Sequence, residues 1–424
     1  MRDSQLSAHT LQGSFVAAQR ALGGALAIFL ALGMASGAGA GPREQAKRIH
    51  DRLVGTPPSI ACLDQLEAKV ANNDAVGAAL DAIDDSGDGD ACTDPAFYNV
   101  TLKNFVTPWT NEEQTVFAPL NDYTATVIGI IRDERDFRQI LWEDVLYIGN
   151  GVSPAYANDS NAHYQAMEDQ GLNLADPTVL VPRAQSAVTG LPAEATAGVI
   201  TTRAAARAFF VDGTNRAMFR FTLLNHLCTD LEQIKDPSRT HDRVPQDVAR
   251  SPGGDSRIFM NACVGCHAGM DPMRQSMAYY DYEYPEGNMD GGRLVYNREG
   301  FIDPDTGDRV QGKYRINANN FEFGYVVKDD RWDNYWRKGP NSALGWDPSL
   351  PGSGYGAKSW GQEFAYSEAF ARCQVEKVFQ AVCFRPPVDA SDRSRVDGMI
   401  ASFTGGGYNL KQVFAETADY CKGN

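Results

Sequence analysis

The sequence predicts a mainly α protein that also carries a small β-hairpin and ends in a three-helix unit. Over most of the chain, apolar residues recur at three- and four-residue spacing, which is typical of amphipathic helices. Between residues 291 and 317 this pattern gives way to short alternating runs separated by Gly, Asp and Pro, which indicates a β-hairpin. With 424 residues, the chain is long enough for two or three domains.

The first forty residues have the features of an export signal. A polar stretch with Arg2 and Arg20 precedes an apolar run over residues 21–34, and Ala38 and Ala40 form an A-x-A cleavage site. The apolar run is too short to span a bilayer comfortably, and no later window is long and apolar enough. We therefore expect residues 1–40 to be a signal peptide. The mature chain is expected to lack a transmembrane segment and to be periplasmic or secreted.

Residues 41–120 are expected to form an N-terminal helical region. Helical spacing runs over residues 42–84, and the acidic stretch 84–90 then breaks it. This stretch imitates the start of a calcium-binding loop, but Pro95 stands where the bidentate Glu belongs, so a solvated turn is favoured. The acidic turn at residues 303–308 is interpreted in the same way, as a hairpin tip rather than a cation site.

A second helical domain is expected over residues 121–250. Residues 122–149 are predicted as helices that begin behind an N-cap at Asp122. Residues 214–234 are predicted as one long helix, because the apolar spacing continues through them.

The stretch at residues 263–267 reads CVGCH, although the chain has only eight cysteines and six histidines. The pattern C-x-x-C-H is how a polypeptide binds haem covalently. Its two thiols add to the vinyl groups, and the adjacent imidazole becomes an axial ligand of the iron. We therefore expect one covalent haem c attached to Cys263 and Cys266, with His267 as the proximal ligand.

Other interpretations of this motif need features that the sequence does not display. A zinc site needs a second pair of ligands, and a thioredoxin-like redox pair needs a βαβ context. A structural disulfide beside an accidental histidine remains an alternative.

The haem motif lies in a segment that we delimit as residues 251–345, with the predicted hairpin inside it. A loop and a C-terminal helical unit are expected over residues 346–424. Residues 332–362 are rich in Gly, Pro and Trp and are predicted as a long ordered loop over an apolar surface, either a haem edge or the helical core. The three terminal helices are expected at residues 367–384, 391–403 and 409–421.

Four stretches, taken in order, resemble the planctomycete-type exported cytochrome c modules. They read DYTATVIGIIRDERDF, TNRAMFRFTLLNHLC, CVGCHAGMDPMRQSMAYYDY and FARCQVEKVFQAVCFRPP. In that family, a leucine-rich helix ending in Cys precedes a C-x-x-C-H-x-x-x-D-P motif, and a helix pair closes the chain. The resemblance covers roughly residues 120–424, although MRQS follows Asp-Pro where a Gly-containing turn is commoner. It implies haem c, export and a helical cytochrome c-like haem domain, but no substrate.

The sixth ligand of the iron is less determined than the proximal one. Met270 and Met273 follow His267 too closely to reach the distal face and are interpreted as pocket lining. Met289 is the first choice for the distal ligand. The alternatives are Met277, Met399, His50, His163, His226 and His241, or an open or water-bound position.

Six cysteines remain outside the haem motif, and in an oxidising compartment an even number predicts three disulfides. Cys373 and Cys383 cannot pair within one helix, because ten residues rise about 15 Å and a disulfide needs Cα atoms within about 7 Å. We expect the pairs Cys62–Cys92, Cys383–Cys421 and Cys228–Cys373. An exchange of partners between the last two pairs is the alternative.

The precursor carries a net charge of −15, and removal of residues 1–40, with Arg2, Arg20 and Asp3, leaves −16. Such a charge argues against nucleic acid and anionic membranes as partners, and it suits either solubility or a basic redox partner protein. The expected function is electron transfer through a single haem. The alternatives are a peroxidase-like haem oxidoreductase with an open distal site, or a haem-bearing binding module of an exported degradation system.

Overall fold

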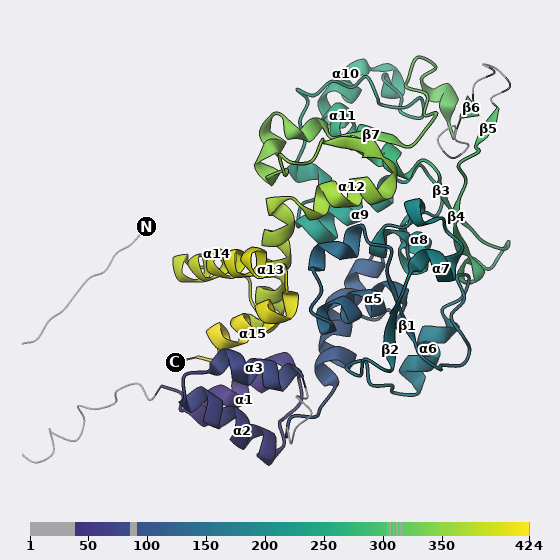
Figure 1. Ribbon diagram of the computed structural model, residues 1–424. Coiled ribbons are helices and arrows are strands. Elements are labelled where there is room, and N and C mark those ends of the chain that lie inside the picture. Colours follow the sequence, from purple (N-terminus) through teal and green to yellow (C-terminus); the bar gives the residue numbers. More distant parts are fainter. Residues whose placement is uncertain are drawn as a thin grey trace, which may run out of the picture. The chain divides into compact units, whose positions relative to one another are not determined.

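The computed structural model describes residues 39–84, 91–302, 304, 307, 309–310, 313 and 316–423 (Figure 1). The predicted signal peptide lies outside the described residues, apart from its last two. The acidic stretch after Asp84 and most of the 303–308 turn also lie outside them. Helices dominate the described part of the chain, and the strands form short two-stranded antiparallel sheets. This confirms the mainly α prediction.

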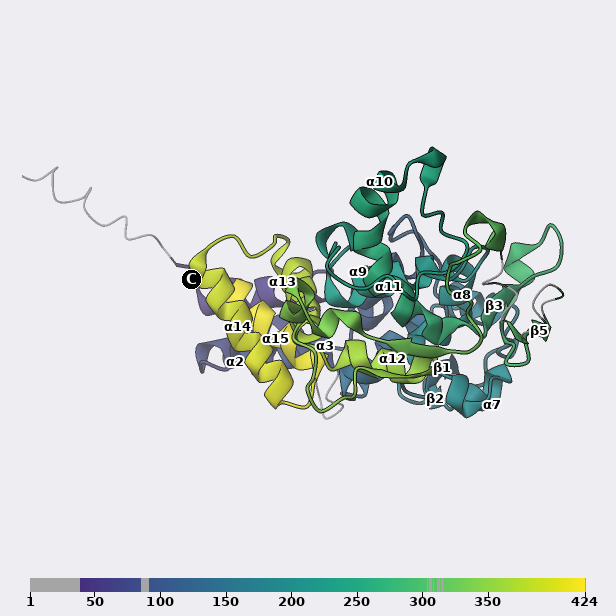
Figure 2. The ribbon, with the colours of Figure 1, turned by 90° about the horizontal axis from the view of Figure 1, so that it is seen from above.

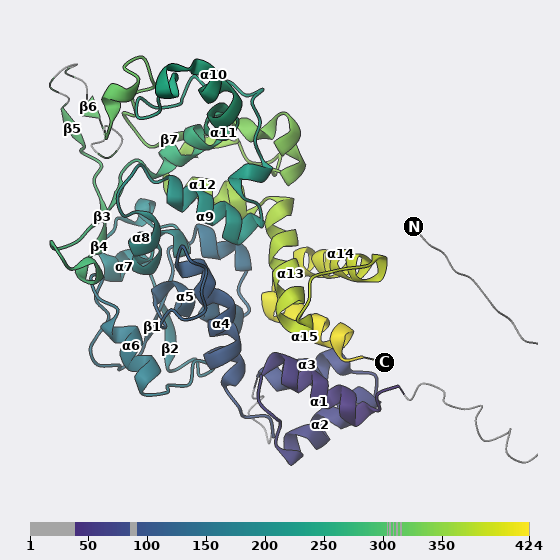
Figure 3. The ribbon, with the colours of Figure 1, turned by 180° about the vertical axis from the view of Figure 1, so that it is seen from behind.

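Three N-terminal helices pack on one another and against the last helix of the chain (Figure 3). They are α1 (Pro42–Leu53), α2 (Ile60–Ala71) and α3 (Ala75–Ile83), and the last helix is α15 (Leu410–Cys421). Ser59 caps α2 by accepting from the Cys62 amide, and Asp74 caps α3 by accepting from the Gly77 amide. The N-terminal and C-terminal segments therefore share one apolar core.

The helix α5 (Asp122–Arg132) is buried along its whole length (Figure 1). Its N-cap is Asn121, which accepts from the Thr124 amide, and not Asp122 as predicted. Asp122 instead accepts from the Arg203 and Ala204 amides at 2.6 and 3.0 Å, so it stabilises the start of another helix. The helical elements that contact α5 include η1 (Phe97–Leu102), α4 (Lys103–Val106), η2 (Thr107–Thr110), η3 (Phe137–Leu141), η5 (Gly198–Thr201) and α8 (Arg203–Phe209). The same part of the chain also contains α6 (Ala162–Asp169), α7 (Gln185–Thr189) and η4 (Ala193–Ala195).

Two predicted helical stretches are shorter than their patterns suggest. Residues 122–149 end in the strand β1 (Leu146–Gly149), which pairs with β2 (Leu180–Arg183). The expected helix over residues 214–234 is α9 (Arg216–Leu227), because Cys228 adopts a left-handed φ of 51° and ends it. A separate turn, η6 (Leu231–Gln233), follows.

The β structure around the CVGCH motif also differs in detail from the prediction. β4 (Arg293–Tyr296) pairs with β3 (Tyr280–Glu283), which the sequence had not indicated, while β5 (Phe301–Ile302) and β6 (Arg309–Val310) form the hairpin. The Trp-rich stretch contributes β7 (Arg331–Asp333), which pairs with β8 (Ser353–Tyr355). The short turns η7 (Pro252–Gly254), η9 (Gln275–Met277), η10 (Met289–Gly291), η12 (Ala318–Asn320), η13 (Tyr335–Arg337) and η14 (Pro340–Leu344) connect these elements.

The C-terminal helices are α12 (Gly356–Ala365), α13 (Glu368–Cys383), α14 (Ala390–Gly405) and α15. The last three pack on one another, as Figure 2 shows, whereas α12 falls partly in the stretch predicted as a loop. No helix in the described ranges is long and apolar enough to cross a membrane.

Three disulfides join segments that are distant in the sequence. They are Cys62–Cys92, Cys228–Cys373 and Cys383–Cys421, with Cα–Cα distances of 4.8, 5.2 and 5.6 Å. This is the pairing expected from the sequence, and it is consistent with an extracytoplasmic protein. Cys228–Cys373 links the end of α9 to α13.

We expect loss of the Cys228–Cys373 link to destabilise the fold more than loss of Cys383–Cys421. The first closes a separation of 145 residues and the second one of 38, and a longer loop loses more entropy in the unfolded chain. Double replacement by Ser should lower the free energy of unfolding by roughly 5 and 4 kcal/mol. Urea denaturation of both variants tests this, and a larger loss for the 383–421 pair would contradict it.

Candidate functional site

The CVGCH motif lies where a short helix, a π-turn and a longer helix run together. These are α10 (Ser256–Ile258), η8 (Phe259–Cys263) and α11 (Val264–Arg274). Cys263 closes the π-turn, a local widening that is frequent at functional sites. Cys266 and His267 follow at i+3 and i+4, so all three side chains share one side of the helix. All three are partly exposed, and neither thiol forms a disulfide.

The opposite side of α11 is buried and depends on two glycines. A Cβ on Gly269 would lie 1.8 Å from Nε1 of Trp336, and a Cβ on Gly265 would lie 3.2 Å from Cβ of Lys235. The Asp236 amide also donates to the Gly265 carbonyl at 2.9 Å. This close packing fixes the helix so that the cysteine and histidine side is turned outward.

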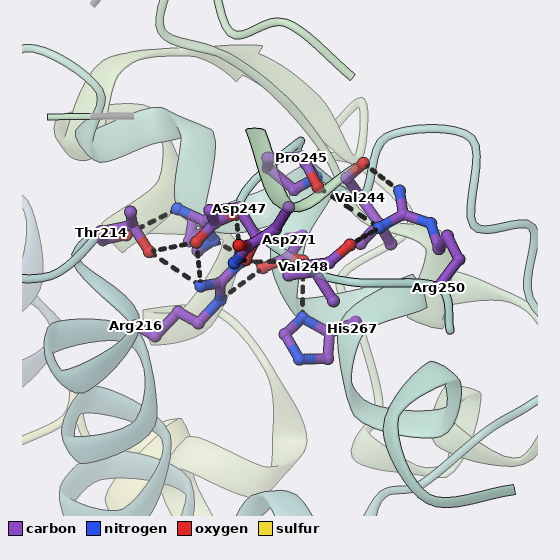
Figure 4. Close-up of polar contacts among 11 residues, drawn as sticks. Thr214, Arg216, Val244, Pro245, Asp247, Val248, Arg250, His267 and Asp271 are labelled. Carbon is purple, nitrogen blue, oxygen red and sulfur yellow. Dashed lines mark hydrogen bonds and ion pairs between the residues drawn. The ribbon is translucent and has the colours of Figure 1, made fainter. Parts of the chain in front are cut away.

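The His267 ring is held by a buried carboxylate one turn further along the helix. Nδ1 of His267 lies 2.7 Å from Oδ2 of Asp271, and the rest of the ring points away from the cluster (Figure 4). The His267 side chain is 20% exposed, whereas that of Asp271 is fully buried. With Nδ1 bonded to the carboxylate, Nε2 is the nitrogen left to bind a metal.

Two arginines share the same carboxylate. Oδ1 of Asp271 accepts from Nε of Arg274 at 2.5 Å and from Nε of Arg216 at 3.1 Å. Burial alone would raise the pKa of Asp271, but Arg216, Arg274 and His267 hold it well below its usual range. Asp271 is therefore a stable anion at neutral pH.

Arg216 connects this carboxylate to a second one. It projects from the first turn of α9, and its Nη1 donates to Oδ2 of Asp247 at 2.6 Å. The turn that carries Asp247 is held by Arg250, which donates to the carbonyls of Val244 and Pro245 at 2.6 and 3.3 Å. Figure 4 shows this chain of contacts from α9 to His267.

The Cys266 thiol does not have the environment of a reactive redox cysteine. Burial raises the pKa of the Cys266 thiol, and its Sγ lies 3.5 Å from the Leu231 carbonyl oxygen. Redox-active cysteines have lowered pKa values. Across the described ranges, no group of three or more His, Cys, Asp or Glu residues is placed to hold a metal ion.

The residues present fit covalent haem attachment. Two thiols without disulfide partners stand beside an imidazole whose Nε2 is available, all on one partly exposed side. Ile258 and Met260, on the preceding turns, are 45% and 48% exposed and offer apolar contact next to the thiols. Cys263, Cys266 and His267 would hold the haem.

The structure does not bring Met289 together with these three residues. It lies on η10, where its neighbour Asp290 contacts Arg203 and Arg207 of α8. Met289 as the distal ligand therefore stays a prediction.

Most of the other candidates for the sixth ligand are buried elsewhere. His226 bonds the Tyr123 hydroxyl at 2.8 Å, and Met399 receives a hydrogen bond from the Thr417 hydroxyl at 3.3 Å. His50, His163 and Met277 are also buried, as are Met270 and Met273, which were interpreted as pocket lining. His241 lies near the motif, since its ring is 5.8 Å from that of Phe259 in η8. Both line a pocket of about 330 Å³ together with Met260.

The polar residues around His267 were not identified from the sequence. A signal existed for Asp271, because it follows His267 at i+4 within a predicted haem helix and this spacing indicates a contact. Arg216 and Asp247 carry no such signal, because they come from separate segments that only the fold brings together.

No protein-family model matches the chain, and comparisons with curated proteins and with solved structures also gave no match.

Replacing Gly269 by Ala should destabilise the protein, because the new methyl group would overlap the buried Trp336 indole. Overpacking of this kind costs about 1–3 kcal/mol. Gly398→Ala is the matched control, since Gly398 is an exposed glycine in α14 with open space around its Cβ position. The free energy of unfolding of this variant should rise by about 0.5–1 kcal/mol, because Ala has a higher helix propensity than Gly. The Tm measured by thermal unfolding should fall for Gly269→Ala and rise for Gly398→Ala. Shifts of the same sign would count against the packing described.

Proposed function

We propose that the protein is an exported c-type cytochrome that transfers electrons through one covalently bound haem. The observation that carries the proposal is the arrangement of Cys263, Cys266 and His267 on one side of α11. Their free thiols and the imidazole held by Asp271 are the groups that haem c attachment uses. The resemblance of the flanking stretches to planctomycete-type cytochrome modules supports the same function.

The haem supplies one-electron chemistry between ferric and ferrous iron, and the chain supplies attachment, an axial ligand and a surface for the partner. The net charge of −15 favours a basic redox partner over nucleic acid. The disulfides support a periplasmic or secreted location.

A second candidate function is a peroxidase-like oxidoreductase with an open distal position. Two observations favour it. Four candidates for a sixth ligand, His50, His163, His226 and Met399, are buried in the fold. In addition, Asp271 makes the imidazole a stronger donor, which stabilises oxidised iron.

The reaction of the ferrous protein with carbon monoxide separates the two functions. An electron-transfer cytochrome with two protein ligands should keep its low-spin spectrum when carbon monoxide is added. An open distal site should bind the gas rapidly and change the spectrum within the mixing time. Rapid binding by the wild-type protein would reject the two-ligand form of the proposal.

Met289→Leu tests the predicted distal ligand directly. If Met289 binds the iron, the variant should lose its low-spin spectrum and gain carbon monoxide binding. Met270→Leu is the control, because Met270 is buried in the core and should affect packing alone. An unchanged spectrum in Met289→Leu would exclude Met289 as the ligand.

A further inference from the structure

The two oxygens of Asp271 have different partners. Oδ2 accepts from Nδ1 of His267 at 2.7 Å, and the next contact of this oxygen, Nη2 of Arg216, is at 3.4 Å. Oδ1 receives the shorter arginine bonds, from Arg274 and Arg216. One carboxylate therefore joins the imidazole on one side to two cations on the other.

The cations affect how strongly this carboxylate acts on the imidazole. A carboxylate that accepts the Nδ1 proton makes Nε2 a stronger donor to a metal. Arginines on the other oxygen draw negative charge away from the histidine and weaken this effect. Asp247 in turn neutralises part of the Arg216 charge, since Arg216 donates to both of its oxygens, at 2.6 and 3.1 Å.

We propose that Asp271 and Arg216 are positioning residues that set the reduction potential of the haem with opposite signs. Asp271 orients His267 with Nε2 outward and strengthens it as a ligand, which stabilises ferric iron and lowers the potential. Arg216 opposes Asp271 and raises the potential. This inference rests on the proposed function, because it requires a haem bound through His267.

The fold supports this role, because neither residue is held loosely. Asp271 is fully buried on the rigid helix α11, and Arg216 reaches it from the first turn of α9. Arg216 also bonds the Thr214 hydroxyl at 2.9 Å, so its guanidinium is fixed from three directions. Groups held in this way have one arrangement, and a change in either should therefore appear as a defined shift in potential.

The test is the midpoint potential of the holoprotein and of three variants, measured by redox titration at pH 7. Asp271→Asn keeps the shape of the side chain but loses the charge. It should raise the midpoint potential by at least about 59 mV, which is a tenfold shift of a one-electron equilibrium towards the ferrous form. Arg216→Gln should shift the potential in the opposite direction. Asp247→Asn is the matched control, because it removes a charge from the same cluster without a contact to His267. It should raise the potential by less than half as much as Asp271→Asn.

Equal shifts in Asp271→Asn and Asp247→Asn would show that only the overall charge matters and would overturn the inference. A rise in potential for Arg216→Gln would overturn it as well, and this variant decides the question if Asp271→Asn fails to fold. The mass of the wild-type protein keeps the two proposals apart. A chain without haem rejects the proposed function, whereas a haem-bearing chain with equal shifts rejects only this inference.

Discussion

The contact between His267 and the buried Asp271 is the interaction on which the rest of the site depends. It leaves Nε2 as the outward nitrogen, and it brings a charge into the protein that must be compensated. Arg274 compensates it from the same helix, and Arg216 does so from α9. The ion pairs therefore bind α9 and α11 to each other, and an arrangement suited to holding a metal ligand also stabilises the local fold.

The remaining contacts keep α11 in place so that the side bearing Cys266 and His267 stays partly exposed. Gly265 and Gly269 allow the chain around Lys235 and the Trp336 indole to approach the buried side of the helix. The Cys228–Cys373 disulfide anchors the segment that leads from α9 towards the motif. In the described part of the chain, the residues proposed to hold the haem thus lie on or at the start of a well-packed helix rather than on a loop, which suits a group whose redox properties depend on fixed geometry.

The sequence predicted those features that depend on local spacing. The helical class followed from apolar periodicity. The distance that one helix imposes between Cys373 and Cys383 excluded that pair, and the structure has the pairing preferred over an exchange of partners. Features that depend on distant partners were missed. Asn121 and Asp122 are both good N-caps, and only the position of α8, which begins 81 residues after Asp122, explains why Asp122 accepts from the first amides of that helix instead. The apolar run of β1 is so short that its periodicity fits a helix as well as a strand. Its pairing with β2 makes it a strand.

The same division applies to the site. Cys263, Cys266 and His267 were evident from a five-residue pattern, whereas Arg216 and Asp247 lie 51 and 20 residues before His267 in the sequence and only the fold brings them near it.

The central claim is that the two thiols of the motif carry a haem. The most direct measurement is tandem mass spectrometry of the protein produced together with a haem c maturation system. Our account predicts one haem per chain, attached through thioethers to Cys263 and Cys266, with the other six cysteines in disulfides. Unmodified Cys263 and Cys266, or either one linked to another cysteine, would contradict it.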